Sequence, residues 1–192
     1  MTDRRQEILS ELLQQFTPGF LIDLGTGDGG FARLAADAGW WVTATDARRR
    51  DRPEHPRITW VTEDVRVTDL SGFDLILCIG LFYHLTFQDQ IRLLHKCAGT
   101  PLIVDTHLAA STERSARFGP YEGRMYQEPN WWSDPWGSWQ NAESFWPTLD
   151  SFERMARAYG RYTSIIPTEP WHASDRTFFF LTGERPWSSG KS

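Results

Sequence analysis

The chain has 192 residues, enough for one domain with a substantial core and too few for a nucleotide-binding domain joined to a separate catalytic domain of ordinary size. Its 20 basic and 25 acidic residues give a net charge of −5, which disfavours nucleic acid as a partner, and its two cysteines do not suggest a disulfide framework. The charged start and the lack of an 18-residue apolar run predict a cytoplasmic protein without a signal peptide or membrane span.

The spacing of apolar residues predicts helices and strands that alternate along most of the chain. An N-terminal helix is expected within residues 1–19, with Ile8, Leu9 and Leu12 on its apolar face, followed by one α/β domain over residues 20–192. Strands are expected at 20–24, 41–45, 58–62, 73–79, 102–106, 162–166 and 177–182, and helices at 30–38, 86–97 and 148–160. The link between residues 64 and 73 is too short for an ordinary crossover helix. This order is typical of a doubly wound parallel sheet, which binds ligands at the carboxyl ends of its central strands.

The strand at 20–24 runs directly into a glycine-rich turn, Gly25-Thr-Gly27-Asp-Gly29-Gly30. Glycine accepts positive φ and lets a ligand approach the backbone, and the N–H groups of the following helix attract polar or anionic groups. The spacing also fits the dinucleotide fingerprint, with Asp46 lying 21 residues after Gly25 as a ribose-binding acid. The turn therefore predicts a nucleotide-like ligand, and the glycines alone leave its class open.

Asp23, two residues before the first glycine, favours a methyl donor. The string Asp23-Leu-Gly25-Thr-Gly27-Asp-Gly29 resembles motif I of class I S-adenosylmethionine-dependent methyltransferases. The resemblance covers residues 20–106 and 148–182, and it implies a single Rossmann-like domain with a seven-stranded, mostly parallel sheet whose last strand is antiparallel. It also implies S-adenosylmethionine as cofactor, held by Asp23, Gly25, Gly27, Asp28 and Gly29 at the methionine end, by Asp46 at the ribose, by Asp64 and Val65 at the adenine, and by Ile79 and Gly80 after the fourth strand.

Two histidines follow strands at the expected ligand edge. Tyr83 and His84 lie in a segment similar to the one after the fourth strand of many small-molecule methyltransferases, where an aromatic face can stabilise the cationic sulfonium. His84 is a packing residue, a substrate contact or a base. His107 and Asp105 lie on the same side of an extended strand. We expect His107 to act as the general base for an acceptor hydroxyl, with a structural histidine as the alternative.

A bound Mg²⁺ is a further expectation at this edge. Asp105 could orient the imidazole or ligate the ion, which would lower the pKa of the acceptor hydroxyl. Glu122, Glu128 and Asp134 are the other oxygen ligands to consider, although none has a diagnostic spacing.

Residues 107–147 break the alternation and are expected to form a tryptophan-rich lid or substrate insertion. Flat aromatic faces interleaved with amides, arginine and acids suit a polyhydroxylated ring. The Gly-Arg-x-Tyr and Ser-Phe-Trp-Pro-Thr strings are also similar to the insertions of small sugar and polysaccharide O-methyltransferases. The expected acceptor contacts are Tyr83, Tyr121, Arg124, Tyr126, Trp131, Trp136 and Trp139. Tryptophans that fix the insertion to the body or form a homodimer contact are the alternative.

A run of charge, Arg48-Arg49-Arg50-Asp51-Arg52, follows the second strand. Such a run is typical of a solvated loop. An edge of the cofactor pocket and a contact to an anionic substrate are the alternatives.

Together these patterns predict an S-adenosylmethionine-dependent O-methyltransferase of a small hydroxylated acceptor, with a sugar or oligosaccharide favoured. Three rivals remain. One is a tRNA-modifying methyltransferase, whose segment after the fourth strand is similar to residues 80–84. The others are a non-catalytic cofactor-binding domain that presents its tryptophans to a partner, and a nicotinamide-binding domain.

Overall fold

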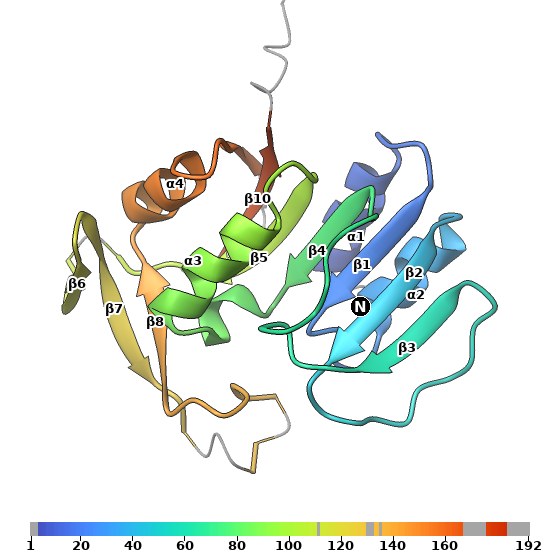
Figure 1. The fold of residues 1–192 in the computed structure, drawn as a ribbon, viewed down its shortest axis with the longest axis horizontal. Helices are drawn as coiled ribbons and strands as arrows, with labels where there is room; N and C mark the ends of the chain where they lie inside the picture. The colour runs from blue at the N-terminus through green and yellow to red at the C-terminus, as the bar shows by residue number, and fades with distance from the viewer. Residues whose placement is uncertain (1–3, 111, 130–132, 135, 167–175, 184–192) are drawn as a thin grey trace, which may run out of the picture.

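The computed structural model describes residues 4–110, 112–129, 133–134, 136–166 and 176–183, and a seven-stranded sheet runs through its centre (Figure 1). The strands are β1 (Phe20–Leu24), β2 (Trp41–Asp46), β3 (Ile58–Thr62), β4 (Leu75–Ile79), β5 (Leu102–His107), β9 (Tyr162–Ile166) and β10 (Arg176–Thr182). Their order in space is β3-β2-β1-β4-β5-β10-β9. The last strand, β10, pairs antiparallel with both of its neighbours, and the other pairings are parallel. The predicted fold class is therefore confirmed.

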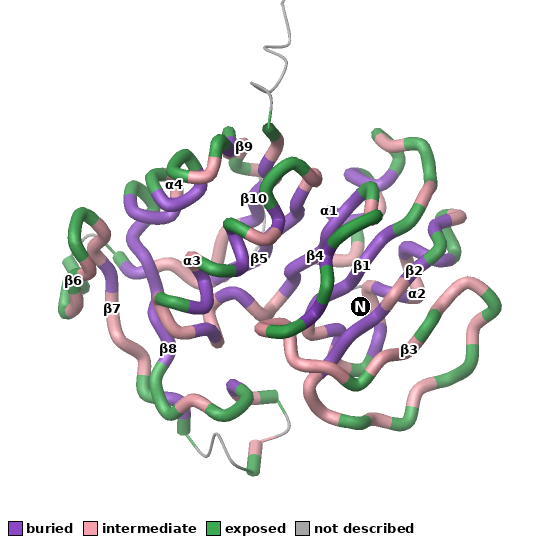
Figure 2. Tube along the Cα trace, in the orientation of Figure 1, coloured by how far each residue is buried: buried purple, intermediate pink, exposed green. Residues whose placement is uncertain are grey.

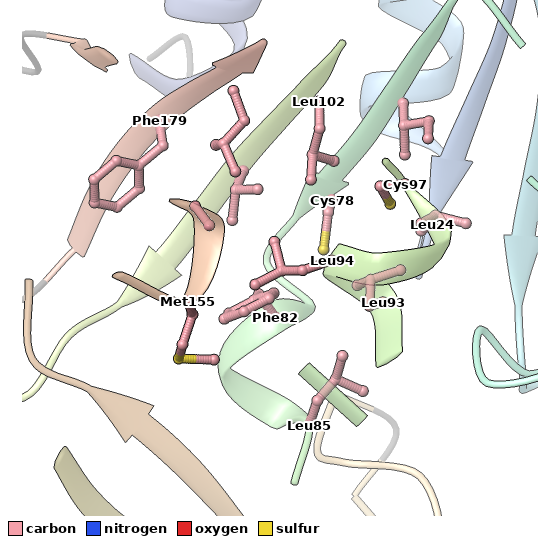
Figure 3. Packing of buried hydrophobic residues seen from close by; sticks show 14 of the residues in the cluster. Leu24, Cys78, Phe82, Leu85, Leu93, Leu94, Cys97, Leu102, Met155 and Phe179 are labelled. Atoms are coloured by element: carbon pink, nitrogen blue, oxygen red, sulfur yellow. The ribbon is translucent and has the colours of Figure 1, made fainter. Parts of the chain in front are cut away.

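Four α-helices in the described part of the chain cover the two faces of this sheet (Figure 1). The first cluster of buried side chains contains residues of α1 (Arg4–Leu13) and α2 (Gly30–Asp37), such as Leu9 and Ala35. The second cluster contains Leu93 of α3 (Phe87–Lys96) and Met155 of α4 (Leu149–Arg157), together with the sheet residue Cys78 (Figure 3). No helix in the described part of the chain is both long and apolar enough to cross a membrane.

Burial follows from the position of each strand in the sheet. Every residue of the central strand β4 is buried, because helices cover it on both sides, whereas the edge strand β3 has no buried residue (Figure 2). No helix interrupts residues 63–74, as expected for the short link between β3 and β4. β4 begins at Leu75 instead of residue 73. Asp74 contacts the start of β1 through two hydrogen bonds of 2.8 Å: its side chain accepts from the N–H of Phe20, and its own N–H donates to the carbonyl of Phe20.

The insertion after β5 forms a small second sheet. Strands β6 (Ala116–Phe118), β7 (Tyr121–Gln127) and β8 (Glu143–Pro147) pair antiparallel in that order. Phe118 stacks on Phe87 of α3 with ring centroids 4.5 Å apart, which fixes this sheet to the body. At Gly123 a Cβ would overlap the carbonyl oxygen of Trp146 on the neighbouring strand, so the close pairing of β7 and β8 requires glycine.

Candidate active site

The glycine-rich turn joins β1 to α2 and is fixed by hydrogen bonds to β2. The N–H of Thr26 donates to the carbonyl of Thr45 at 2.9 Å, and the N–H of Gly27 donates to Oδ2 of Asp46 at 3.0 Å. Gly27 has φ of +56°, where a side chain is strained, and a Cβ there would lie 3.3 Å from the ring of Trp136. The turn thus needs glycine both for its backbone and for the space beside Trp136.

The turn opens onto a cavity of about 390 Å³ at the carboxyl ends of β1 to β4. That volume is within the range of small-molecule sites. Most of the residues predicted to hold the cofactor line it together: Gly25, Gly27, Asp28, Asp46, Asp64, Val65, Ile79 and Gly80. Asp23 and Gly29 lie outside the lining, although Thr26, which lines the cavity, contacts Asp23.

Asp23 is 1% exposed, and its Oδ2 accepts a hydrogen bond from the hydroxyl of Thr26 at 2.6 Å. Burial raises the pKa of this carboxyl from its usual 3.8 to about 7, against the lowering effect of the Thr26 hydroxyl. Asp23 therefore takes up a proton near neutral pH.

Two more acids follow the next two strands. Asp46 at the end of β2 accepts hydrogen bonds from the N–H groups of Gly27 and Arg48, the latter at 2.8 Å. Asp64, after β3, is paired with the guanidinium of Arg66. Burial opposes the charge of Asp64, but the hydrogen bonds from Arg66 outweigh it and hold the pKa of Asp64 below its usual value.

The segment 136–141, between β7 and β8, lies over the same cavity. Trp136, Trp139 and Asn141 contribute to its lining. Arg48 donates to the carbonyls of Gly137 at 3.1 Å and Ser138 at 2.7 Å. The charge run after β2 thus forms an edge of the pocket, as one of the alternatives for this run predicts.

Arginine side chains also lie over tryptophan rings at this edge. The guanidinium carbon of Arg50 lies 4.5 Å from the ring centroid of Trp136, and that of Arg48 lies 5.1 Å from Trp139. Cations over indole faces are attracted by the ring quadrupole. These pairs hold the two predicted acceptor contacts Trp136 and Trp139 against the strand ends.

His84 lies in the short helix η1 (Phe82–His84) after β4, and it lines the cavity beside Tyr83. Its Nδ1 is 2.9 Å from Oε1 of Glu128, a residue that follows β7 and is 5% exposed. Asn141 donates from its amide to the carbonyl of His84 at 3.2 Å. Residues far apart in the sequence therefore fix both the ring and the backbone of this histidine.

Asp105 and His107, both on β5, lie outside the cavity lining. Asp105 is fully buried, and both its oxygens accept hydrogen bonds from the guanidinium of Arg176 on β10, at 3.2 and 2.7 Å. The His107 ring stacks on Trp146 with centroids 4.6 Å apart and meets Tyr83 edge-on at 4.5 Å.

Three predicted acceptor contacts on β7 also lie outside the lining. Tyr126 stacks on Trp146 at 4.6 Å, and Arg124 lies 4.3 Å over the same indole. Tyr121 packs against the core cluster beneath the second sheet. The remaining predicted contact, Trp131, falls outside the described residues.

A sequence profile described as a methyltransferase domain matches residues 1–162, which is most of the chain. The match includes the four acids of the predicted cofactor site, Asp23, Asp28, Asp46 and Asp64, and the whole of β5. The chain belongs to this methyltransferase family. No curated protein sequence matches the methyltransferase.

Solved structures agree on the fold. The N-terminal domain of EvdMO1, crystallised with SAH and D-fucose, has a TM-score of 0.71 at 15% identity, over 94% of this chain and 82% of that one. The glycopeptide N-methyltransferase MtfA with S-adenosylhomocysteine has a TM-score of 0.61 at 16% identity, over 94% and 87%. The 1,6-didemethyltoxoflavin-N1-methyltransferase of Burkholderia thailandensis has a TM-score of 0.62 at 16% identity, over 92% and 76%. The chain is a class I S-adenosylmethionine-dependent methyltransferase, and the glycine turn and cavity fit that cofactor.

A magnesium site does not fit the described residues of the methyltransferase. They contain no group of three or more His, Cys, Asp or Glu side chains placed to hold a metal ion. Arg176 engages both oxygens of Asp105, the predicted ligand.

Sequence reasoning missed two partners in the methyltransferase. Arg176, the partner of Asp105, precedes the predicted last strand by one residue, and only the antiparallel pairing of β10 with β5 brings the two together. Glu128 was considered only as a metal ligand, and its contact with His84 spans 44 residues, so no spacing indicates it.

Proposed function

We propose that the enzyme transfers a methyl group to a hydroxyl of a small polyhydroxylated acceptor, with saccharides as the favoured class. The observation that carries this proposal is the composition of the cavity wall next to the glycine turn. Tyr83, Trp136 and Trp139 supply aromatic surface, and His84 and Asn141 supply polar groups. Aromatic rings stack on the C–H face of a sugar while polar side chains bond its hydroxyls.

The structural neighbours support a small acceptor without choosing its chemistry. One was crystallised in the presence of D-fucose, and others are named as N-methyltransferases of a glycopeptide and of 1,6-didemethyltoxoflavin. Their sequence identities of about 15% support a shared fold only. The proposal of oxygen instead of nitrogen as the methylated atom therefore depends on the residues of this chain.

In the proposed reaction the chain mainly positions the two partners. The backbone of the glycine turn and the carboxylate of Asp46 hold the cofactor, because carboxylates accept strong hydrogen bonds from ribose hydroxyls. Bound S-adenosylmethionine supplies an electrophilic methyl group on a sulfonium. The aromatic wall orients the acceptor for in-line attack, and a histidine removes the hydroxyl proton.

An acceptor screen with radiolabelled S-adenosylmethionine tests the proposal. The full chain is incubated separately with monosaccharides including D-fucose, oligosaccharides, amines, glycopeptides and tRNA. Each incubation is run with added Mg²⁺ and again with a chelator. We expect label on a saccharide hydroxyl, stable to mild base. Label confined to amines or to tRNA would refute O-methylation of a sugar.

A further inference from the structure

We infer that His84 and Glu128 form a catalytic dyad in which His84 is the general base and Glu128 is its positioning residue. This inference rests on the proposed hydroxyl acceptor and names the group that takes its proton. Of the two histidines near the sheet edge, His84 lines the cofactor cavity and His107 does not.

The Glu128 carboxylate fixes the tautomer of His84. An ionised carboxylate only accepts hydrogen bonds, so the contact of 2.9 Å requires the proton on Nδ1. Nε2 then keeps its lone pair and is the nitrogen left for an acceptor hydroxyl. A base prepared in this way needs no tautomer change before it takes a proton.

The environment of Glu128 also favours this role. Its side chain is 2% exposed, and among the described residues His84 is its ion-pair partner. The electrostatic stabilisation of a buried carboxylate by its partner is greatest when that partner becomes a cation. The charge of Glu128 therefore stabilises the imidazolium that forms when His84 accepts the proton.

Hydrogen bonds hold the backbone of both Glu128 and His84 in place. The N–H of Glu128 donates to the carbonyl of Ala142 at 2.8 Å, which extends the pairing of β7 with β8, and Asn141 binds the carbonyl of His84. The dyad is thus built by the insertion and by the segment after β4 together, at the wall where Trp136 and Trp139 lie.

The acceptor oxygen forms a bond to the methyl carbon while the carbon–sulfur bond breaks, and the electron pair of that bond stays on sulfur, which becomes a neutral thioether. His84 Nε2 takes the hydroxyl proton and later releases it to solvent.

The first test needs no acceptor. Long-range ¹⁵N–¹H spectra of the full chain, labelled at histidine and saturated with S-adenosylhomocysteine, should show His84 as the Nδ1–H tautomer. Glu128→Ala should abolish this preference. A wild-type His84 in the Nε2–H form would overturn the inference, whatever the acceptor screen shows.

The second test is kinetic and uses the acceptor that the screen identifies. His84→Gln should lower kcat by about 10²- to 10⁴-fold, the usual contribution of a general base, and Glu128→Ala by at least about tenfold. Both should change the Kd of S-adenosylhomocysteine by less than about threefold. With His84→Ala, added imidazole should restore part of the lost kcat, which a packing role does not predict.

His55→Gln is the matched control, because His55 also lies 3.3 Å from a carboxylate, Asp37, but outside the cofactor cavity. It should leave kcat unchanged. If His84→Gln keeps its kcat while His107→Gln loses it, the dyad is refuted and His107 is the base. A wild-type enzyme that methylates only amines instead refutes the proposed function, and the tautomer spectra still decide the dyad.

Discussion

Replacing Asp23 by asparagine should make the protein more stable at alkaline pH. The folded pKa of about 7 against the usual 3.8 corresponds to about 4 kcal/mol that the folded state loses when the carboxyl ionises in the buried site. Because the folded state holds this proton more tightly than the unfolded chain, stability falls as pH rises from about 4 to about 7 and is then level. Asparagine does not titrate and keeps an oxygen that can accept from Thr26.

Urea unfolding of both proteins at pH 5 and pH 8 measures this effect. Between these values the free energy of unfolding of the wild type should fall by about 3 kcal/mol more than that of Asp23→Asn. Asp150→Asn, which changes a side chain that is 76% exposed, should show no such difference from the wild type. An Asp23→Asn protein with the same pH dependence as the wild type would refute the raised pKa. A confirmed effect would mark Asp23 as an acid kept at a cost in stability, as expected for a functional group.

Three further perturbations test the site. Gly27→Ala should raise the Kd of S-adenosylhomocysteine at least tenfold in calorimetry. Gly119→Ala is the control, because Gly119 has nearly the same φ but open space around it, and it should leave this Kd unchanged. Equal Kd values for the two variants would contradict the crowding beside the cavity. Arg48→Ala removes two charge-assisted hydrogen bonds to the 136–141 segment and should raise the Kd of S-adenosylhomocysteine about tenfold. Arg49 is exposed, so Arg49→Ala is the control and should have the Kd of the wild type. Arg176→Ala removes the bidentate partner of the fully buried Asp105 and leaves Arg5, 3.9 Å away, as an ion-pair partner. The free energy of unfolding should fall by about 3 kcal/mol, and a loss below about 1 kcal/mol in urea unfolding would refute that account.

Most of the central sheet was predictable because its signals are local. Apolar runs such as the one at β4 and the glycines after β1 carry their meaning within a few residues, and Thr148 caps α4 with its side chain as a helix start requires. The pattern of acids after strands indicated the ligand edge, and Asp46 and Asp64 do line one cavity.

The second sheet and the contact between His84 and Glu128 could not be predicted, because their signals are not local. β6 has only three residues, and β7 mixes buried and half-exposed positions without a period of two. The partner of His84 is chosen by the antiparallel pairing of β7 with β8, which brings residue 128 back to the main sheet. Such contacts depend on the register of strands, and no residue spacing encodes them.

The position of β10 has a consequence for how the chain reaches its native state. Among the described residues this strand follows β9 in the sequence, yet it lies inside the sheet between β5 and β9. Until β10 is inserted, β5 has an open edge and β9 has no neighbouring strand. The sheet therefore cannot form strand by strand, in chain order, while the ribosome releases the protein. We therefore expect folding to be completed late, by a pairing that joins residues about 70 positions apart, and to be slow for a protein of this size.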